Sequence, residues 1–311
     1  MSDTTFDEFS FLRGQADAAG VAVPPVRRLQ HTLPDGRVVS ALHYGAPGAK
    51  AIDAPVVTFL HGAGLNAHTW DTTVLSLGLP ALVLDLPGHG DSSWREDGAY
   101  TGGTLAVDVA PAIAAWTEAP QVLVGHSLGG LTAAAVAAAH PELVAALVVV
   151  DISPGINPNG SAAQIRAFYA GPSDWASRDE LLERALAFGF GGSRESAARG
   201  VFLNSRVRED GRVEWKHHFA HLAATALAAH DPGTPTAPSV LHETGWDDLA
   251  AVTAPVTLVR AERGFVSAAD AEEFQRRLPE ARVVAMDATH NVQETAPRDL
   301  ALLVGSATAA G

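Results

Sequence analysis

The chain has 311 residues, of which 47% are apolar, so it can bury a full hydrophobic core and is not a disordered chain. Its 35 acidic and 21 basic residues give a net charge of -14, which argues against nucleic acid or an anionic membrane as a partner. There is no cysteine, so disulfides, thiolate catalysis and thiolate metal sites are excluded.

The first 25 residues are polar and predict a helical or loosely packed leader. Residues 1–8 are acidic and lack the basic start and apolar centre of a signal peptide, so we expect a cytoplasmic protein. The longest apolar region, residues 131–150, is interrupted by His140, Pro141 and Glu142. It therefore predicts a helix followed by a strand, not a membrane span.

Short apolar runs alternate with helical patterns through the first half of the chain. The predicted strands cover residues 26–32, 38–44, 56–60, 81–84, 122–124 and 146–150, and the predicted helices cover 100–116 and 131–140. Asp35-Gly36, between the first two strands, is typical of a β-hairpin. Strands that alternate with helices predict an α/β fold, with a mostly parallel central sheet covered by helices on both faces.

The pattern changes between Ser153 and Val240, where strand-like runs disappear and helices are predicted over 179–188 and 215–230. After Trp246 the alternation returns, with strands predicted over 256–259 and 283–286 and helices over 268–278 and 296–304. We therefore predict a core made of residues 1–152 and 241–311. A mainly helical cap, residues 153–240, is inserted before the last two strands.

A Gly-x-Ser-x-Gly pentapeptide centred on Ser127 lies between the predicted strand 122–124 and the predicted helix 131–140. A strand that runs through such a sequence into a helix forms a sharp turn, which lifts the serine hydroxyl above the edge of the sheet. This context predicts that Ser127 is a nucleophile. The alternative is a glycine-rich turn with a serine that takes no part in chemistry.

A serine nucleophile needs a base, and His290 follows the last predicted strand, on a loop that can reach the serine. Three other histidines lie near predicted strand ends. His126 is inside the pentapeptide, and we expect its side chain to point away from the position of the base. His61 and His89 lie in glycine-rich loops, which we expect them to brace.

The base needs a carboxylate to orient it, and three candidates follow predicted strands. Asp151 comes directly after the strand 146–150, one strand along from Ser127. Glu262 and Asp270 follow the strand 256–259, where Glu262 has Arg263 as a neighbour and Asp270 suits the first turn of a helix. We favour Asp151, and Glu262 stays open as the alternative.

A developing oxyanion needs two N–H donors. The N–H of Leu128, directly after Ser127, is one candidate, and the N–H of Ala63 in the glycine-rich loop 61–64 is the other. Gly62 in the same loop is a candidate for contact with the substrate. The alternative is that loop 61–64 is an ordinary glycine turn.

Together these motifs resemble the α/β-hydrolase superfamily. The resemblance covers about residues 40–152 and 246–300 and rests on four features in the family's order: His61-Gly62-Ala63-Gly64 with Trp70, Asp85 to Ser92, Gly125 to Gly130, and His290. It implies the α/β-hydrolase fold, with Ser127 as nucleophile, His290 as base, and Ala63 and Leu128 as the donors to the oxyanion.

The chain departs from most of that family at the acid. Most members place it after the strand that matches 256–259, and the matching position here is Gly264. A minority place it after the preceding strand, so Asp151 makes this chain similar to zearalenone-type lactonases and some dehalogenases. Because Ser127 replaces the aspartate nucleophile of epoxide hydrolases and dehalogenases, we do not expect their chemistry. The turn 85–92 is expected to brace a neighbouring loop.

Three residues of the predicted cap are candidates for an apolar substrate pocket over Ser127: Trp175, Trp215 and His221. The alternative is that the aromatic side chains pack the cap onto the core. His217, His218 and His221 lie close together in sequence, but they have no matching carboxylate cluster, so we predict no metal site.

These features predict a cofactor-independent serine hydrolase that cleaves a small-molecule carboxylic ester or lactone, with a hydrophobic or aromatic substrate. A carbon–carbon bond hydrolase of aromatic degradation or a perhydrolase would use the same three residues and remains an alternative. A lactone-binding receptor is a more remote one. We expect no cofactor, and the oligomeric state stays open, with a homodimer among the options.

Overall fold

An eight-stranded sheet lies at the centre of the structure, a computed structural model that describes residues 7–156, 171–188, 193–222 and 245–309. In chain order its strands are β1 (Val26–Thr32), β2 (Val38–Tyr44), β3 (Val57–Leu60), β4 (Ala81–Asp85), β5 (Gln121–His126), β6 (Val144–Val150), β10 (Val256–Arg263) and β11 (Arg282–Thr289). They are arranged in the order β1-β2-β4-β3-β5-β6-β10-β11. Only the pairs β1–β2 and β2–β4 are antiparallel, so the mostly parallel sheet predicted from the sequence is confirmed.

Each face of this sheet buries its own hydrophobic cluster, and β6 contributes to both. Leu147 and Val149 belong to the first cluster, whereas Ala146, Val148 and Val150 belong to the second. Neighbouring side chains of a strand point to opposite faces, so an uninterrupted apolar run is what a strand buried on both sides requires.

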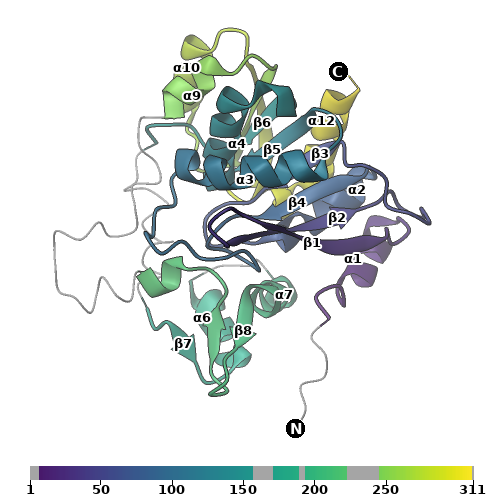
Figure 1. The fold of residues 1–311 in the computed structure, drawn as a ribbon, viewed down its shortest axis with the longest axis vertical. Helices are drawn as coiled ribbons and strands as arrows, with labels where there is room; N and C mark the ends of the chain where they lie inside the picture. The colour runs from purple at the N-terminus through teal and green to yellow at the C-terminus, as the bar shows by residue number, and fades with distance from the viewer. Residues whose placement is uncertain (1–6, 157–170, 189–192, 223–244, 310–311) are drawn as a thin grey trace, which may run out of the picture.

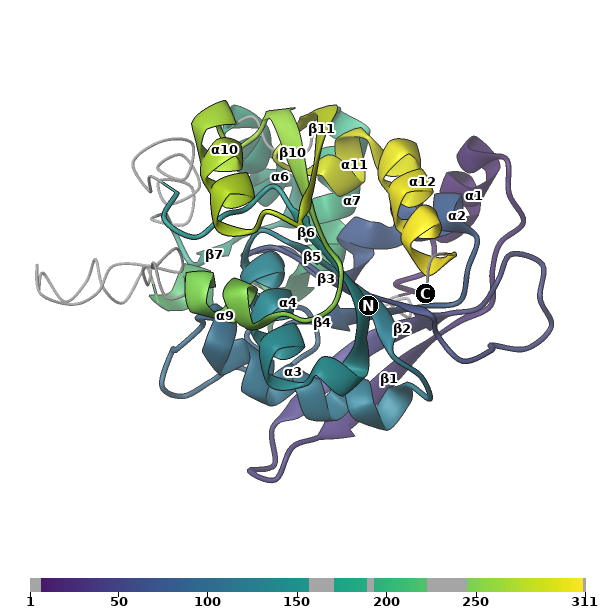
Figure 2. The same ribbon diagram turned by 90° about the horizontal axis from the view of Figure 1, so that it is seen from above.

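Helices cover both faces, as Figures 1 and 2 show. Those packed on the first cluster are α3 (Gly102–Trp116), α4 (Leu128–Ala139), α9 (Gly245–Ala251) and α10 (Ala268–Arg277). Those packed on the second are α1 (Leu12–Ala19), α2 (Asp71–Leu77) and α12 (Pro297–Thr308). Shorter helical turns are η1 (Ala67–Trp70), η2 (Pro141–Leu143) and α11 (Val292–Thr295). No helix in the described part of the chain has the length and apolar character needed to cross a membrane.

The segment inserted between β6 and β10 has a small core of its own, and we call its described parts, residues 171–188 and 193–222, the cap. It contains β7 (Asp174–Trp175), α6 (Arg178–Ala187), α7 (Arg194–Asn204), β8 (Ser205–Val207) and β9 (Val213–Trp215). The strands form a three-stranded antiparallel sheet in the order β7-β9-β8. In Figure 1 the labelled cap elements lie together, at a distance from α9, α10 and α12.

The small sheet was not predicted for the mainly helical cap, and the helix predicted over 215–230 is wrong at its start. Trp215 ends β9, and helical residues begin only at Phe219. The reason is a hairpin between β8 and β9 that turns at Gly211, where φ is +81°. Residues 223–230 of that predicted helix, and the predicted boundary after 240, lie outside the described residues.

Candidate active site

Ser127 lies at the turn between β5 and α4, in a backbone conformation that only a tightly packed site can hold. Its φ is +52° and its ψ is -121°, which costs a non-glycine residue on the order of 1–3 kcal/mol. Its N–H donates to Val150 O at 3.0 Å, which ties the turn to the end of β6. A Cβ at Gly125 would overlap Gly129 O, and one at Gly129 would overlap Leu60 O. Both flanking glycines are therefore required for this close approach.

His290 and Asp151 come together from the ends of two different strands. His290 follows β11, and its Nδ1–H donates to Asp151 Oδ2 at 2.8 Å. Because the carboxylate accepts at Nδ1, the other ring nitrogen, Nε2, is left without a proton and is the atom that can act as a base. The imidazole ring also lies beside His126, the neighbour of Ser127, with 4.6 Å between the ring centroids.

Asp151 is fully buried, and backbone donors satisfy its charge. Oδ1 accepts hydrogen bonds from the N–H groups of Ala261 at 3.0 Å and Val266 at 3.4 Å, and Oδ2 accepts one from Phe265 at 2.7 Å. A buried carboxylate without such partners would be strongly unfavourable. The residue also adopts φ +48°, a left-handed conformation that aspartate tolerates better than most residues.

Gly264, the position at which the family resemblance would place the acid, leaves its space to Asp151. A Cβ at Gly264 would overlap the Asp151 carboxylate, so the two positions supply side chains to the same space. The other candidate acids lie elsewhere: Glu262 is exposed, and Asp270 forms a capping box with Ser267 at the start of α10. The structure therefore brings Asp151, and neither alternative, to His290.

Two residues that the sequence did not indicate hold His290 in place. The expectation that His126 points away from the base is wrong, because its Nε2–H donates to His290 O at 2.9 Å. The pKa of His126 is held well below its usual 6.5, mainly by burial and to a lesser degree by the neighbouring His290, so its ring is neutral. On the other side the Phe265 ring stacks on His290, with centroids 3.5 Å apart and planes 10° apart.

The loop after β3 lies directly against Ser127. A Cβ at Gly62 would lie 3.1 Å from Ser127 Cβ and 2.7 Å from His126 Nδ1, so only glycine fits here without a shift of its neighbours. The N–H of Ala63, the next residue, donates to no acceptor within the described parts of the chain. Leu128 is the first residue of α4, where a backbone N–H has no partner in its own helix.

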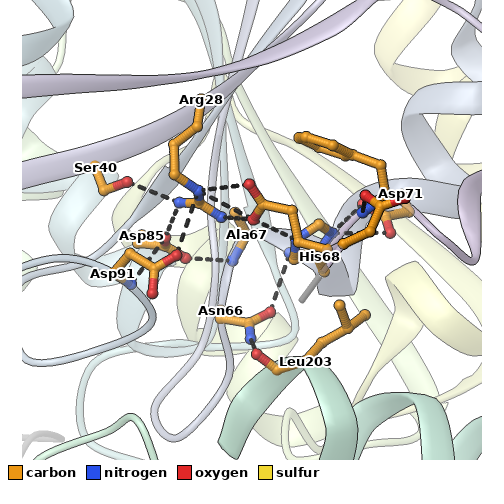
Figure 3. A network of polar contacts seen from close by, with 12 residues as sticks. Arg28, Ser40, Asn66, Ala67, His68, Asp71, Asp85, Asp91 and Leu203 are labelled. Carbon is orange, nitrogen blue, oxygen red and sulfur yellow. Dashed lines mark hydrogen bonds and ion pairs between the residues drawn. The ribbon is translucent and has the colours of Figure 1, made fainter. Parts of the chain in front are cut away.

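Polar side chains of the core hold the loop after β3 in place, as expected for His61 and for the turn after β4. His61 Nδ1–H donates to Gly62 O at 2.8 Å, and Nε2 accepts the N–H of Leu86 at 3.0 Å. Burial lowers the pKa of His61, so its ring carries no proton at Nε2. Asp85 Oδ1 accepts the N–H of Ala67 at 2.8 Å, while Arg28 pairs with its other oxygen at 2.6 Å, as Figure 3 shows.

The three cap candidates are placed as follows. Trp175 and Trp215 are 3% and 6% exposed and meet edge to face in the hydrophobic cluster of the cap, with centroids 5.9 Å apart. Both side chains thus pack within the cap's own cluster, whereas the alternative expected them to pack the cap onto the core. His221 lies 4.8 Å from the ring of Trp94 and 3.5 Å from Glu214. The described residues contain no group of three or more histidine, aspartate or glutamate side chains able to hold a metal ion.

Residues 59–301 match the model of a family described as "Alpha/beta hydrolase family". The chain belongs to this family. The match covers the turn that carries Ser127, the loop after β3 and His290, so the fold and family predicted from the sequence are confirmed.

The chain is similar over most of its length to proteins of Mycobacterium tuberculosis and Mesorhizobium japonicum. It is 37% identical over 311 residues to the esterase Rv0045c of Mycobacterium tuberculosis, which covers 97% of this chain and 95% of that protein. A solved structure of the M. tuberculosis esterase superposes with a TM-score of 0.79 at 36% identity, over 97% of this chain and 99% of the other. The 2-(acetamidomethylene)succinate hydrolase of Mesorhizobium japonicum is 29% identical over 247 residues, which is 78% of this chain and 84% of that protein.

Proposed function

We propose that this chain is a serine hydrolase of carboxylic esters, with Ser127, His290 and Asp151 as its catalytic residues. The observation that carries the proposal is the hydrogen bond from His290 Nδ1 to the buried Asp151 carboxylate, next to the strained turn at Ser127. Membership of the family and the likeness to an esterase over 97% of the chain support the ester as the bond that is cleaved.

The reaction follows from this arrangement. Nε2 of His290 takes the proton of the Ser127 hydroxyl while the oxygen attacks the ester carbonyl. The N–H groups of Leu128 and Ala63 stabilise the negative oxygen that develops. His290 then gives its proton to the departing alcohol, which leaves an acyl group on Ser127. Water, deprotonated by His290, attacks this acyl-enzyme. The bond to the Ser127 oxygen then breaks, His290 returns the proton to that oxygen, and the acid is released.

We propose that the substrate is a small-molecule ester or lactone with hydrophobic or aromatic character. The Phe265 ring stacked on His290 places apolar surface beside the base, and the segment that holds the cap begins after β6, the strand that Asp151 directly follows. Apolar surface next to a few fixed polar groups is typical of small-molecule sites. The aromatic residues of the described cap pack mainly within it, so the proposal does not depend on Trp175 or Trp215 touching the substrate.

Steady-state hydrolysis of a short-chain p-nitrophenyl ester and of a bulky aryl lactone tests this function, with Ser127→Ala as the control. We expect turnover of at least one of them by the native chain and none by Ser127→Ala, with an unchanged circular dichroism spectrum. A fluorophosphonate should add one phosphonyl group to the native chain, measured by mass spectrometry, and none to the variant.

The two substrates also separate the finer alternatives. Faster turnover of the lactone favours a lactonase, and faster turnover of the simple ester favours a general carboxylesterase. Activity retained by Ser127→Ala would refute the serine mechanism. If the fluorophosphonate labels Ser127 but neither substrate turns over, the proposal of ester hydrolysis is wrong. A carbon–carbon bond hydrolase or a lactone-binding receptor then becomes the better explanation.

A further inference from the structure

Two asparagine side chains join the cap to the loop that carries Ala63. Asn204, the last residue of α7, donates from Nδ2 to Gly64 O at 2.6 Å. Asn66 donates from Nδ2 to Leu203 O at 3.0 Å, in the opposite direction. Figure 3 shows Asn66 between the core and α7, with its amide directed at Leu203. The last carbonyl groups of a helix have no partner in that helix, so the loop also caps α7.

The hydrogen bonds inside this loop connect Asn204 to the N–H of Ala63. Gly64 O, the acceptor for Asn204, shares one planar peptide group with the N–H of Leu65. That N–H donates to Gly62 O at 3.2 Å, which closes a four-residue turn with φ +75° at Gly64. Gly62 O in turn shares its peptide group with the N–H of Ala63, and in a trans peptide these two groups point in opposite directions.

Asn204 thus holds the Gly64–Leu65 peptide group from the cap, and this group donates to the Gly62–Ala63 peptide group, which His61 also holds from the core. Glycine has little preference of its own, so the Gly64 peptide depends on its hydrogen bonds for its direction. The core fixes the two ends of the loop, through His61 Nδ1–H at Gly62 O and through Asp85 at the N–H of Ala67. Among the described residues, Asn204 is the side chain that holds the carbonyl group between these two ends.

From this geometry we propose that Asn204 is a positioning residue for the oxyanion hole, so that the cap has to be docked for full catalytic activity. The proposal rests on the proposed function, because it takes the N–H of Ala63 as a donor to the oxyanion. Such a donor has to lie within about 2.7–3.1 Å of the oxygen, so a small rotation of its peptide group slows the reaction. The substrate would be bound as before.

Asn204→Asp and Asn204→Ala test the proposal, with Lys216→Gln as the matched control. Aspartate has the shape of asparagine but presents an oxygen to Gly64 O, so it should turn the peptide away. Lys216 makes a different contact between cap and core, an ion pair with Asp91 at 2.9 Å, far in sequence from the loop 61–67. We expect kcat to fall at least tenfold in Asn204→Ala and further in Asn204→Asp, with KM within twofold and Lys216→Gln unchanged.

Inhibition by a trifluoromethyl ketone separates positioning from a merely structural role. Its adduct with Ser127 carries an oxyanion, so its Ki should rise in parallel with the loss of kcat in the Asn204 variants. Equal losses in Lys216→Gln, or Asn204 variants with native kcat and Ki, would overturn the proposal. If Ser127→Ala keeps its activity, the proposed function itself fails, whatever the Asn204 variants do.

Discussion

The overlap between Gly264 and Asp151 predicts that the catalytic acid can be moved from one strand to the next. The perturbation is the pair Asp151→Gly and Gly264→Asp. Glycine suits position 151 because φ there is +48°. Gly264 has no such φ, and the obstacle to a side chain is the Asp151 carboxylate itself. Once that carboxylate is removed, an aspartate at 264 enters the space next to His290 Nδ1.

The magnitudes follow from the contacts of Asp151. Loss of the acid of a catalytic triad lowers kcat about 10⁴-fold, which corresponds to about 5 kcal/mol of transition-state stabilisation. It also leaves the N–H groups of Ala261, Phe265 and Val266 without their acceptor, at about 1–3 kcal/mol for each donor that stays buried and unpaired. Gly264→Ala alone should displace the acid, and a displacement of about 1 Å costs about 10²-fold in kcat.

The assay is kcat on a p-nitrophenyl ester for both single variants, the double variant and Gly264→Ala, with thermal unfolding to show that each is folded. We expect the double variant to recover at least tenfold over Asp151→Gly. Glu262→Gln, at an exposed position, is the control and should keep native kcat. A folded double variant with no more activity than Asp151→Gly would refute the argument that positions 151 and 264 reach the same space.

Three further predictions concern the surroundings of the site. His126→Leu removes the donor to His290 O and should lower kcat about tenfold with KM unchanged, whereas His126→Gln, which keeps an N–H donor, should recover most of it in the same assay. Gly62→Ala puts a Cβ 2.7 Å from His126 Nδ1 and should lower kcat by about 10² without unfolding the chain, as circular dichroism can show. At His68, burial opposes protonation, but Asp71 and a second carboxylate raise its pKa to about 9. The rise from 6.5 corresponds to about 3 kcal/mol, so His68→Gln should lower the free energy of unfolding by about this amount below pH 6.5. Because the folded pKa is raised, the difference should vanish as the pH rises through 9, and a constant difference in urea titrations would contradict this.

Most of the core could be predicted because its signals are local. The apolar runs gave the inner strands of the central sheet within a few residues, since a strand buried on both faces has to be apolar throughout, and the Asp35-Gly36 turn indicated the hairpin of β1 and β2. The cap was harder because its strands are only two or three residues long. The Asp210-Gly211 pair, a hairpin signal, was present in the sequence and indicates the turn between β8 and β9.

The candidate site divides in the same way. Ser127 stands out through the glycines that its turn requires, and Asp151 and His290 through their place at strand ends. The contacts of His126, Phe265 and Asn204 could not be predicted, because each depends on how distant segments dock. Asn204 and Gly64 are 140 residues apart, and nothing local to either indicates the other.

The position of the acid has a consequence for how the cap and the site depend on each other. Asp151 directly follows β6, the strand after which the chain leaves the core, and Asn204 contacts the loop after β3 from the cap. The cap is therefore attached both beside the residue that orients the base and at the loop proposed to hold the oxyanion. In a hydrolase with its acid after β10, the first of these links would be missing. Changes in the cap that select a new substrate should accordingly alter kcat as well as KM in this chain.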